Sequence, residues 1–436
     1  MKYISLGLLY LLIAALLSFS CNREDESVIT EENLLASLNA LEDITAEELT
    51  PLTGYARLFA IDIDLPVDHE NPDGQRFVQR MYLSHTSLDA PMVLHLSGYG
   101  GSNLWIIELC NTLRANQLLI PHRGYDEARI EPMDWEHLNI EQAAADNHRV
   151  VELVKSIYRE EWISTGISKG GKSALFLEYL YPEDADVVVA YAAPFLGSYP
   201  DLRIWDFVKT LGDSTVQTDI HRFQHKLLEN RDSTLCYLQE YAEARKLTFT
   251  RVDMETAMEL GVMEYGIYLW QYKTGDPYFY QSDSISHKEM VRRWMLACKP
   301  DYYSDQMQLF SNLFYHQAFS EFGYYDLDDE PVTGLLQKTD RDGLMLFIPE
   351  GVEPQPDFDK ILRMQQWLES KGERIIYIYG GVDPWTAGQL NPDAALDALK
   401  VIQPGANHGV KIKDCDDKSQ VYDKLDEWLE APVNRL

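Results

Sequence analysis

Residues 162–180 restrict the fold of this chain more than any other segment. An apolar run, Trp162–Ile167, leads through Gly-Ile-Ser-Lys-Gly at residues 166–170 into a helical pattern that ends near Leu180. A serine flanked by glycines at a sharp strand-to-helix turn is typical of a nucleophile elbow, where larger flanking side chains would collide. The segment therefore predicts Ser168 as a nucleophile. The backbone N–H of Lys169, at the start of the helix, would donate to an oxyanion.

The same segment also matches a phosphate-binding loop. Residues 166–173 spell G-x-x-x-x-G-K-S, the Walker A pattern, and would make the chain a nucleotide hydrolase. Such a loop normally follows an early strand, whereas four strands are expected before this one. The next apolar run, Val187–Ala192, also lacks the acid that should end a Walker B strand. The elbow is therefore the preferred interpretation, and the nucleotide hydrolase is kept as an alternative.

Strand and helix patterns alternate along most of the chain, which predicts an α/β fold with a mostly parallel sheet covered on both faces. Further strands are expected at Leu58–Leu65, Arg76–His85, Pro91–Leu96, Gln117–Ile120, Val187–Ala192, Gly343–Ile348, Arg374–Tyr379 and Leu399–Ile402. Helices are expected at Ile140–Tyr158 and Phe358–Ser370, near Ala394, and from about Ser419 to Leu429.

The alternation stops in the middle of the chain. Residues 196–336 read as helical and are rich in Tyr, Trp and Phe, as in the cap of a hydrolase. The prediction is an α/β-hydrolase fold whose core comprises residues 51–195 and 337–436, with an inserted helical cap between them. Loops and insertions at the carboxyl edge of such a sheet are where these folds build their sites.

A serine nucleophile needs an acid and a histidine, in this order along the chain. Asp383 lies just past the end of the strand Arg374–Tyr379, after Gly-Gly-Val, and His408 lies in the small-residue loop Pro404–Gly409 before the last helix. His408 would take the proton from Ser168 and return it to the leaving group, while Asp383 would orient the ring. Alone, Asp383 could be a turn-capping residue and His408 a surface residue. Together they predict a triad.

A second oxyanion donor is expected from the loop after the strand Pro91–Leu96. This loop reads Gly98-Tyr99-Gly100-Gly101, and the backbone N–H of Tyr99 or Gly100 is the candidate donor. A plain glycine-rich turn is the alternative.

The amino terminus has the pattern of an export signal. Lys2 precedes the apolar stretch Ile4–Leu17, which is too short to span a bilayer comfortably. The following Leu-Ser-Phe-Ser-Cys, ending at Cys21, resembles the lipobox of bacterial lipoproteins. We expect a signal peptide at residues 1–20, a lipidated acidic tether at residues 21–50, and a protein anchored by lipid to the bacterial cell envelope.

Charge and cysteine content exclude two classes of function. The formal net charge of −32 repels phosphate backbones, so nucleic acid is not an expected partner, whereas the free amino termini of peptides would be attracted. The remaining cysteines show no metal-binding spacing, and no metal or other cofactor is predicted; they are Cys110, Cys236, Cys298 and Cys415.

Several segments together resemble the secreted tripeptidyl aminopeptidases, serine peptidases related to the prolyl carboxypeptidases. The likeness runs from about residue 55 to 415 and is most specific at residues 164–171, Ser-Thr-Gly-Ile-Ser-Lys-Gly-Gly. It includes residues 383–387 and 404–409 around the acid and the base, and segments such as 65–69, 121–124 and 142–149. The chain departs from the family pattern at Lys172, where an apolar residue is expected, and at Gly124, where an aromatic residue is commoner.

This resemblance implies removal of short peptides from free amino termini, often at proline. A carboxylate in the cap would then bind the ammonium group, with Glu264 and Glu321 as candidates, and the aromatics Trp270 and Tyr315 would line a proline pocket. The alternative is that these glutamates are exposed and the aromatics form the cap core. From composition and spacing alone, an esterase or lipase stays open. So does a binding lipoprotein on an inactive scaffold, although the complete triad disfavours it.

Overall fold

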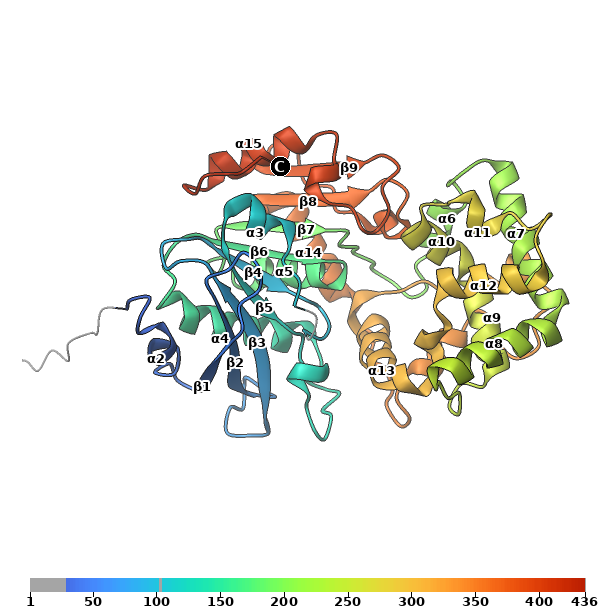
Figure 1. The fold of residues 1–436 in the computed structure, drawn as a ribbon, viewed down its shortest axis with the longest axis horizontal. Helices are drawn as coiled ribbons and strands as arrows, with labels where there is room; N and C mark the ends of the chain where they lie inside the picture. Colours follow the sequence, from blue (N-terminus) through green and yellow to red (C-terminus); the bar gives the residue numbers. More distant parts are fainter. Residues whose placement is uncertain (1–28, 102–103, 436) are drawn as a thin grey trace, which may run out of the picture.

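The computed structural model describes residues 29–101 and 104–435. They form an α/β core and a helical cap, which stand side by side in Figure 1. The core is built on a nine-stranded sheet of order β1-β2-β3-β5-β4-β6-β7-β8-β9. β1, β2, β3 and β5 pair antiparallel, and all other neighbours pair parallel. The mostly parallel α/β-hydrolase fold predicted from the sequence is confirmed.

The central strands are the most buried. Every residue of β4, β5, β7 and β8 is buried, as expected for parallel strands covered on both faces. The strands are β1 (Ile44–Leu49), β2 (Arg57–Pro66), β3 (Arg76–His85), β4 (Met92–Leu96), β5 (Asn116–Ile120), β6 (Trp162–Ile167), β7 (Val187–Tyr191), β8 (Ile375–Gly380) and β9 (Ala398–Gln403).

Helices cover the two faces of the sheet unequally. One apolar cluster joins one face to the helices α4, α5 and α14, and another joins the opposite face to α3 and α15. The core helices are α2 (Leu34–Leu38), α3 (Glu108–Leu113), α4 (Ile140–Lys155), α5 (Lys169–Leu180), α14 (Phe358–Lys371) and α15 (Lys418–Trp428), with the 3-10 turns η1 (Asp126–Ala128), η7 (Pro384–Gly388) and η8 (Ile412–Asp414).

The cap has its own apolar cluster, which reaches the core through Leu196 and Trp385. Its helices are α6 (Arg203–Val208), α7 (Ser214–Glu229), α8 (Arg231–Arg245), α9 (Met254–Met263), α10 (Tyr265–Lys273), α11 (Pro277–Tyr280), α12 (His287–Cys298) and α13 (Gln308–Gln317). A π-helical turn, η4 (Ala318–Phe322), continues α13, and shorter 3-10 turns are η2 (Pro300–Tyr303), η3 (Asp305–Met307), η5 (Glu330–Val332) and η6 (Gly343–Phe347).

Two predicted elements are wrong. The strand expected at Gly343–Ile348 is the 3-10 turn η6, in which Leu344 and Phe347 are buried in the cap cluster while Met345 and Leu346 are exposed. Their spacing of three residues fits a helical turn and not the two-residue period of a strand. The cap therefore extends beyond the predicted boundary at residue 336. The helix expected near Ala394 is an irregular turn.

The amino-terminal tether was also predicted too long. Residues 29–49 belong to the core, because β1 pairs with β2 along all six residues, from Ile44 opposite Ile63 to Leu49 opposite Leu58. Ile44 and Ala46 point inward, so β1 alternates in burial like an edge strand. The predicted signal peptide, Cys21 and the start of the tether lie outside the described residues.

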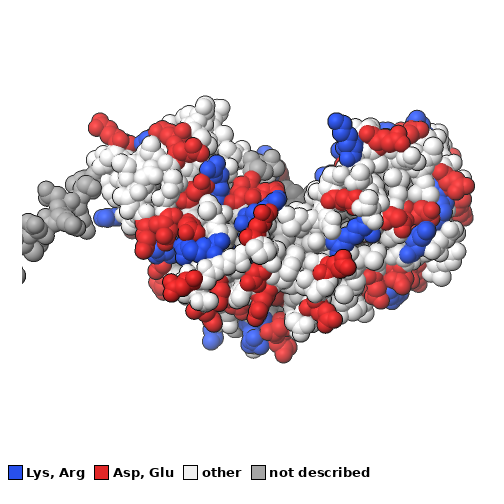
Figure 2. Space-filling view, turned by 90° about the horizontal axis from the view of Figure 1, so that it is seen from below, with Lys and Arg blue, Asp and Glu red and all other residues white. Residues whose placement is uncertain are grey.

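Acidic residues are spread over both the core and the cap on the face drawn in Figure 2, with Lys and Arg scattered among them. Within residues 29–101 and 104–435, no helix is long and apolar enough to cross a membrane. The four cysteines of this part of the chain, Cys110, Cys236, Cys298 and Cys415, are free thiols.

Candidate active site

Ser168 occupies a strained turn between β6 and α5. Its backbone dihedrals are φ 58° and ψ −120°, a conformation that non-glycine residues rarely adopt and that is typical of functional sites. The turn is possible because its neighbours lack side chains: a Cβ on Gly166 would lie 2.3 Å from the carbonyl carbon of Gly170, and one on Gly170 would lie 2.3 Å from the carbonyl oxygen of Leu96. The sequence thus lifts the Ser168 hydroxyl out of the sheet, into a cavity beneath the cap.

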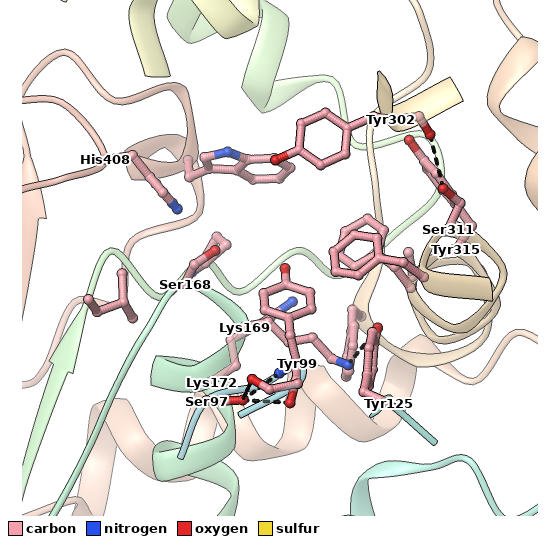
Figure 3. A pocket seen from close by; sticks show the side chains of 18 of the residues that line it. Ser97, Tyr99, Tyr125, Ser168, Lys169, Lys172, Tyr302, Ser311, Tyr315 and His408 are labelled. Atoms are coloured by element: carbon pink, nitrogen blue, oxygen red, sulfur yellow. Dashed lines mark hydrogen bonds between the residues drawn. The ribbon is translucent and has the colours of Figure 1, made fainter. Parts of the chain in front are cut away.

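The predicted acid and base meet beside this serine. Nδ1 of His408 lies 2.7 Å from Oδ2 of Asp383, which is fully buried and also accepts from the N–H of Trp385. This bond leaves Nε2 of His408 for the cavity, and Figure 3 shows the ring pointing toward Ser168. Asp383 follows β8 and His408 follows β9, so adjacent parallel strands bring them together. The arrangement can deprotonate Ser168 and protonate a leaving group.

The cap holds the loop that carries His408. The backbone N–H of His408 donates to the carbonyl of Gln271 on α10, at 3.2 Å. The side chain of Asn407 donates to Thr274 Oγ1, at the end of the same helix. Cap and triad are therefore mechanically connected, and the position of the base depends on where the cap sits.

The geometry rules out the phosphate-binding loop. A P-loop needs several residues of backbone between strand and helix to surround a phosphate. Here Ser168 alone separates β6 from α5, and Lys172 already lies in the first turn of the helix. The Walker A match is a coincidence of the glycines and lysines that the elbow contains.

The two backbone N–H groups expected to donate to an oxyanion differ in whether they already have a hydrogen-bond acceptor. Lys169 is the first residue of α5, so its N–H is at the positive end of the helix next to Ser168. The N–H of Tyr99, by contrast, already donates to Ser97 Oγ at 3.0 Å, which leaves Gly100 as the backbone candidate of that loop. A Cβ on Gly98 would lie 2.4 Å from the nitrogen of Gly170, so this loop packs directly against the elbow.

The side chain of Tyr99, not its backbone, faces the nucleophile. Burial raises the pKa of the Tyr99 hydroxyl, and a hydrogen bond with Ser168 partly offsets that rise. A neutral phenol next to the nucleophile can donate to an oxygen that becomes negative during acylation. Sequence patterns of the glycine-rich loop gave no sign of this role, because they address only its backbone.

A cavity of about 620 Å³ extends from Ser168 into the cap. Aromatic rings from both domains line it, including Tyr99, Tyr272, Tyr302, Tyr315, Tyr325 and Trp385. A mostly apolar cavity of this size with a few convergent polar groups is the usual form of a small-molecule or peptide site.

Two lysines of α5 form part of the cavity floor. Lys169 is almost fully buried, with Nζ 3.4 Å from the hydroxyl of Tyr125, and Lys172 Nζ lies 4.0 Å from the centroid of the Phe322 ring. Burial lowers the pKa of Lys169 well below its ordinary value, and the neighbouring charge of Lys172 lowers it further. Burial lowers the pKa of Lys172 to about 7, against the opposing effect of Glu321.

Glu264 lies behind the cap wall of the cavity. It is fully buried at the junction of α9 and α10, and its two carboxylate oxygens accept from the hydroxyls of Tyr303 and Tyr325, each at 2.5 Å. Both tyrosines line the cavity, whereas Glu264 does not. Burial raises the pKa of Glu264 to about 7, although the two phenols lower it. Tyr303 and Tyr325 therefore stand between Glu264 and the cavity, and the predicted direct contact of Glu264 with a ligand in the cavity is not open to it.

The other predicted substrate-binding residues fall on both sides of the cavity wall. Tyr315 lines the cavity and stacks on Phe347. Trp270 does not line it but packs in the cap core against Gly275. Glu321 is also outside the lining: it accepts from Lys360 Nζ at 3.0 Å and from the N–H of Ile140, so it ties the end of the cap to α14 and α4.

Ser168, Asp383 and His408 on this fold define a serine hydrolase of the α/β-hydrolase class. The sequence itself is more specific, because residues 28–434 match the family model described as PS-10 peptidase S37. The chain belongs to this family and is a serine peptidase. It is also 27% identical over 390 residues to a prolyl tri/tetrapeptidyl aminopeptidase of Streptomyces mobaraensis, with 87% of this chain and 82% of the relative covered.

Solved structures with a similar course of the chain are more distant. A proline iminopeptidase of Mycobacterium smegmatis matches over 84% of this chain and 98% of its own, with a TM-score of 0.43 and 10% identity. An epoxide hydrolase A of Mycobacterium thermoresistibile matches over 89% of this chain and 100% of its own, with a TM-score of 0.33 and 13% identity.

Proposed function

We propose that this protein is an exported aminopeptidase that releases short peptides, chiefly tripeptides, from free amino termini through an acyl-enzyme on Ser168. Glu264 and its two tyrosines carry the proposal. They place a buried carboxylate behind one wall of the cavity that also contains the nucleophile. An enzyme that cuts at a set distance from an amino terminus needs such a group to bind the ammonium end.

The ammonium group would be bound by the tyrosines rather than by Glu264 itself. Each phenol donates its proton to the Glu264 carboxylate, so its oxygen is polarised and turns its lone pairs outward. A substrate ammonium group has three N–H donors and can give one to each phenol oxygen. The carboxylate then stabilises the bound charge through the two hydrogen bonds, in a cavity of low dielectric.

The acylation step follows from the triad. His408 Nε2 accepts the Ser168 proton as Oγ attacks the carbonyl carbon, and Asp383 stabilises the imidazolium that forms. The N–H of Lys169 and the hydroxyl of Tyr99 donate to the oxyanion. His408 then protonates the leaving amine, and a water molecule, deprotonated by the same ring, releases the acyl peptide. The many flat aromatic faces of the cavity, with the relative from Streptomyces, support a preference for proline at the cleavage point.

The cellular location is the second part of the proposal. The export pattern at residues 1–20 and the lipobox-like sequence ending at Cys21 support a lipid-anchored enzyme at the bacterial cell envelope. Its substrates would then be extracellular or periplasmic peptides, and its only contact with the membrane would be through the lipid.

A small substrate panel tests the enzymatic proposal. Xaa-Xaa-Pro coumarylamides with a free amine, the same peptides with an acetylated amine, and short acyl esters would be compared by kcat/KM. We expect cleavage of the free-amine tripeptides, with the intact tripeptide identified as the product by mass spectrometry. Preference for the acetylated peptides or for the esters would instead favour an endopeptidase or an esterase.

A further inference from the structure

The floor of the cavity holds the amino groups of two buried lysines. Both come from α5, the helix that begins next to the nucleophile: Lys169 follows Ser168 directly, and Lys172 lies one turn further, on the same side of the helix. The side chain of Lys172 is more than nine-tenths buried. Within residues 29–101 and 104–435, neither ammonium group has a carboxylate within 4 Å.

None of the described groups around the two lysines forms an ion pair with them. Rings of Tyr99, Tyr125 and Phe322 lie within 6 Å of Lys169 Nζ, and they offer only the weaker attraction of aromatic faces. Glu321 lies outside the cavity lining; its Oε1 accepts from Lys360 and from the N–H of Ile140, and its carboxylate favours the charged form of both cavity lysines without an ion pair to either. Burial disfavours the ammonium form of a lysine without a close anion, and a ligand that brings a carboxylate would favour that form and pair with it.

Building on the proposed function, we propose that Lys172, with Lys169, binds a carboxylate side chain of the substrate, so that the enzyme prefers peptides with Glu or Asp close to the scissile bond on the acyl side. The amine-binding tyrosines and Ser168 belong to the same cavity, and the peptide between them is the acyl segment. Lysines on the first turn after the nucleophile therefore face residues near the bond that is cut. Figure 3 shows both lysines beneath Ser168 and beside Tyr99.

A carboxylate could also come from the free carboxyl terminus of the substrate. That group belongs to the leaving peptide, and the lysines would then select substrates whose leaving peptide has a particular length. The two sources differ in one respect that can be tested: a coumarylamide substrate has no terminal carboxylate.

The experiment compares charged and neutral isosteres. For Ala-Ala-Glu and Ala-Ala-Gln coumarylamides, and for Ala-Glu-Pro and Ala-Gln-Pro coumarylamides, kcat/KM is measured with the wild-type enzyme. We expect the Glu peptide to exceed its Gln partner by at least about tenfold in one of the two pairs, as a charge-assisted hydrogen bond predicts. In Lys172→Met the ratio should fall to near one, and Lys172→Gln should do the same. Lys209→Met, which removes a half-exposed lysine of the cap, should keep the wild-type ratio.

Each result either supports or overturns the binding of a substrate side-chain carboxylate by Lys172 and Lys169. Equal rates on Glu and Gln peptides with the wild-type enzyme would overturn the proposal, and so would a Glu preference that survives in both Lys172 variants. A third comparison uses Ala-Ala-Pro-Ala with a free and an amidated carboxyl terminus; discrimination only there would assign the lysines to the leaving peptide. If no free-amine peptide is cleaved at all, the aminopeptidase function itself fails, which is a different result from cleavage without charge preference.

Discussion

Replacing Glu264 with glutamine tests whether the cap binds the free amino terminus of a peptide. Glutamine keeps the size of the side chain but removes its charge and one of its two acceptor oxygens. One of the phenols, Tyr303 or Tyr325, then loses its acceptor, and the ammonium group loses its ionic partner. A charge-assisted hydrogen bond contributes about 1.5–3 kcal/mol, so kcat/KM on free-amine peptides should fall roughly 10- to 150-fold.

The pH dependence gives a second signature. Burial raises the pKa of Glu264 to about 7, so the ionised form that attracts an ammonium group accumulates only as the pH rises through about 7. The substrate amine loses its proton at about pH 7.7–8.0. The ratio of kcat/KM on free-amine to acetylated peptides should therefore rise toward pH 7 and fall above about 8. Groups that act equally on both substrates cancel in this ratio. Glu264→Gln should lose the rising limb.

The free energy of unfolding should change in the opposite direction over the same pH range. The raised pKa means that between pH 4.5 and about 7 the folded protein binds more protons at Glu264 than the unfolded chain does. The contribution of this residue to the free energy of unfolding therefore decreases as the pH rises through that window, by about 3 kcal/mol in all. Relative to the wild type, Glu264→Gln should be more stable at pH 8 than at pH 5, as measured by urea unfolding.

A matched control separates amine recognition from general damage. Glu321 is also buried and close to the cap–core junction, but it lies outside the cavity lining and pairs with Lys360. Glu321→Gln should leave the ratio of free-amine to acetylated substrates unchanged. An equal loss of activity on both substrate types in Glu264→Gln, or no loss at all, would show that Glu264 does not take part in binding the amino terminus.

Three further predictions concern the reaction and the anchor. Ser168→Ala should lower kcat by about 10³-fold or more, and a fluorophosphonate should label Ser168; labelling of another serine would contradict the triad. Tyr99→Phe should lower kcat by about 10²-fold with little change in KM, since it removes one oxyanion donor, whereas an unchanged kcat would exclude the phenol from that role. Mass spectrometry of the mature protein should find lipid on Cys21 as the first residue; an unmodified terminus elsewhere would leave an exported enzyme without an anchor.

The parallel part of the sheet could be predicted because its strands are short, continuous apolar runs followed by helical patterns. The amino-terminal edge could not. β1 reads Ile-Thr-Ala-Glu-Glu-Leu, and only Ile44 and Ala46 are clearly turned inward, so an acidic edge strand resembled a tether. The strand predicted at 343–348 was wrong because the segment is apolar, not because it is polar. A short apolar stretch fits a strand and a buried helical turn equally well, and packing within the cap determines which of the two forms.

The grouping of Ser168, Asp383 and His408 was predictable because each lies in the segment that follows a parallel β-strand, and the carboxyl ends of such strands meet at one edge of the sheet. No comparable rule of position predicts which residues of the cap face the cavity. Glu264 and Glu321 each stand among aromatic residues and are both buried, and only their partners distinguish a carboxylate behind the substrate cavity from one that joins cap and core. Trp270 and Tyr315 differ in the same way, since one belongs to the cap core and the other to the cavity wall.

The charges inside the cavity also account for how so acidic a protein could select an acidic peptide. Surface charges act through water and salt, and at physiological ionic strength their influence fades beyond about 8 Å, so a net charge of −32 repels a peptide carboxylate only weakly once it is inside. A peptide carboxylate that enters the cavity favours the ammonium form of Lys169 and Lys172, and it pairs with them in a desolvated space where attraction is stronger. With Glu264 behind one wall and the two lysines in the floor, the cavity matches a peptide that carries an ammonium group at its start and a carboxylate near the bond to be cut. Removing either charge should therefore change which peptides are selected more than how fast Ser168 reacts once acylation begins.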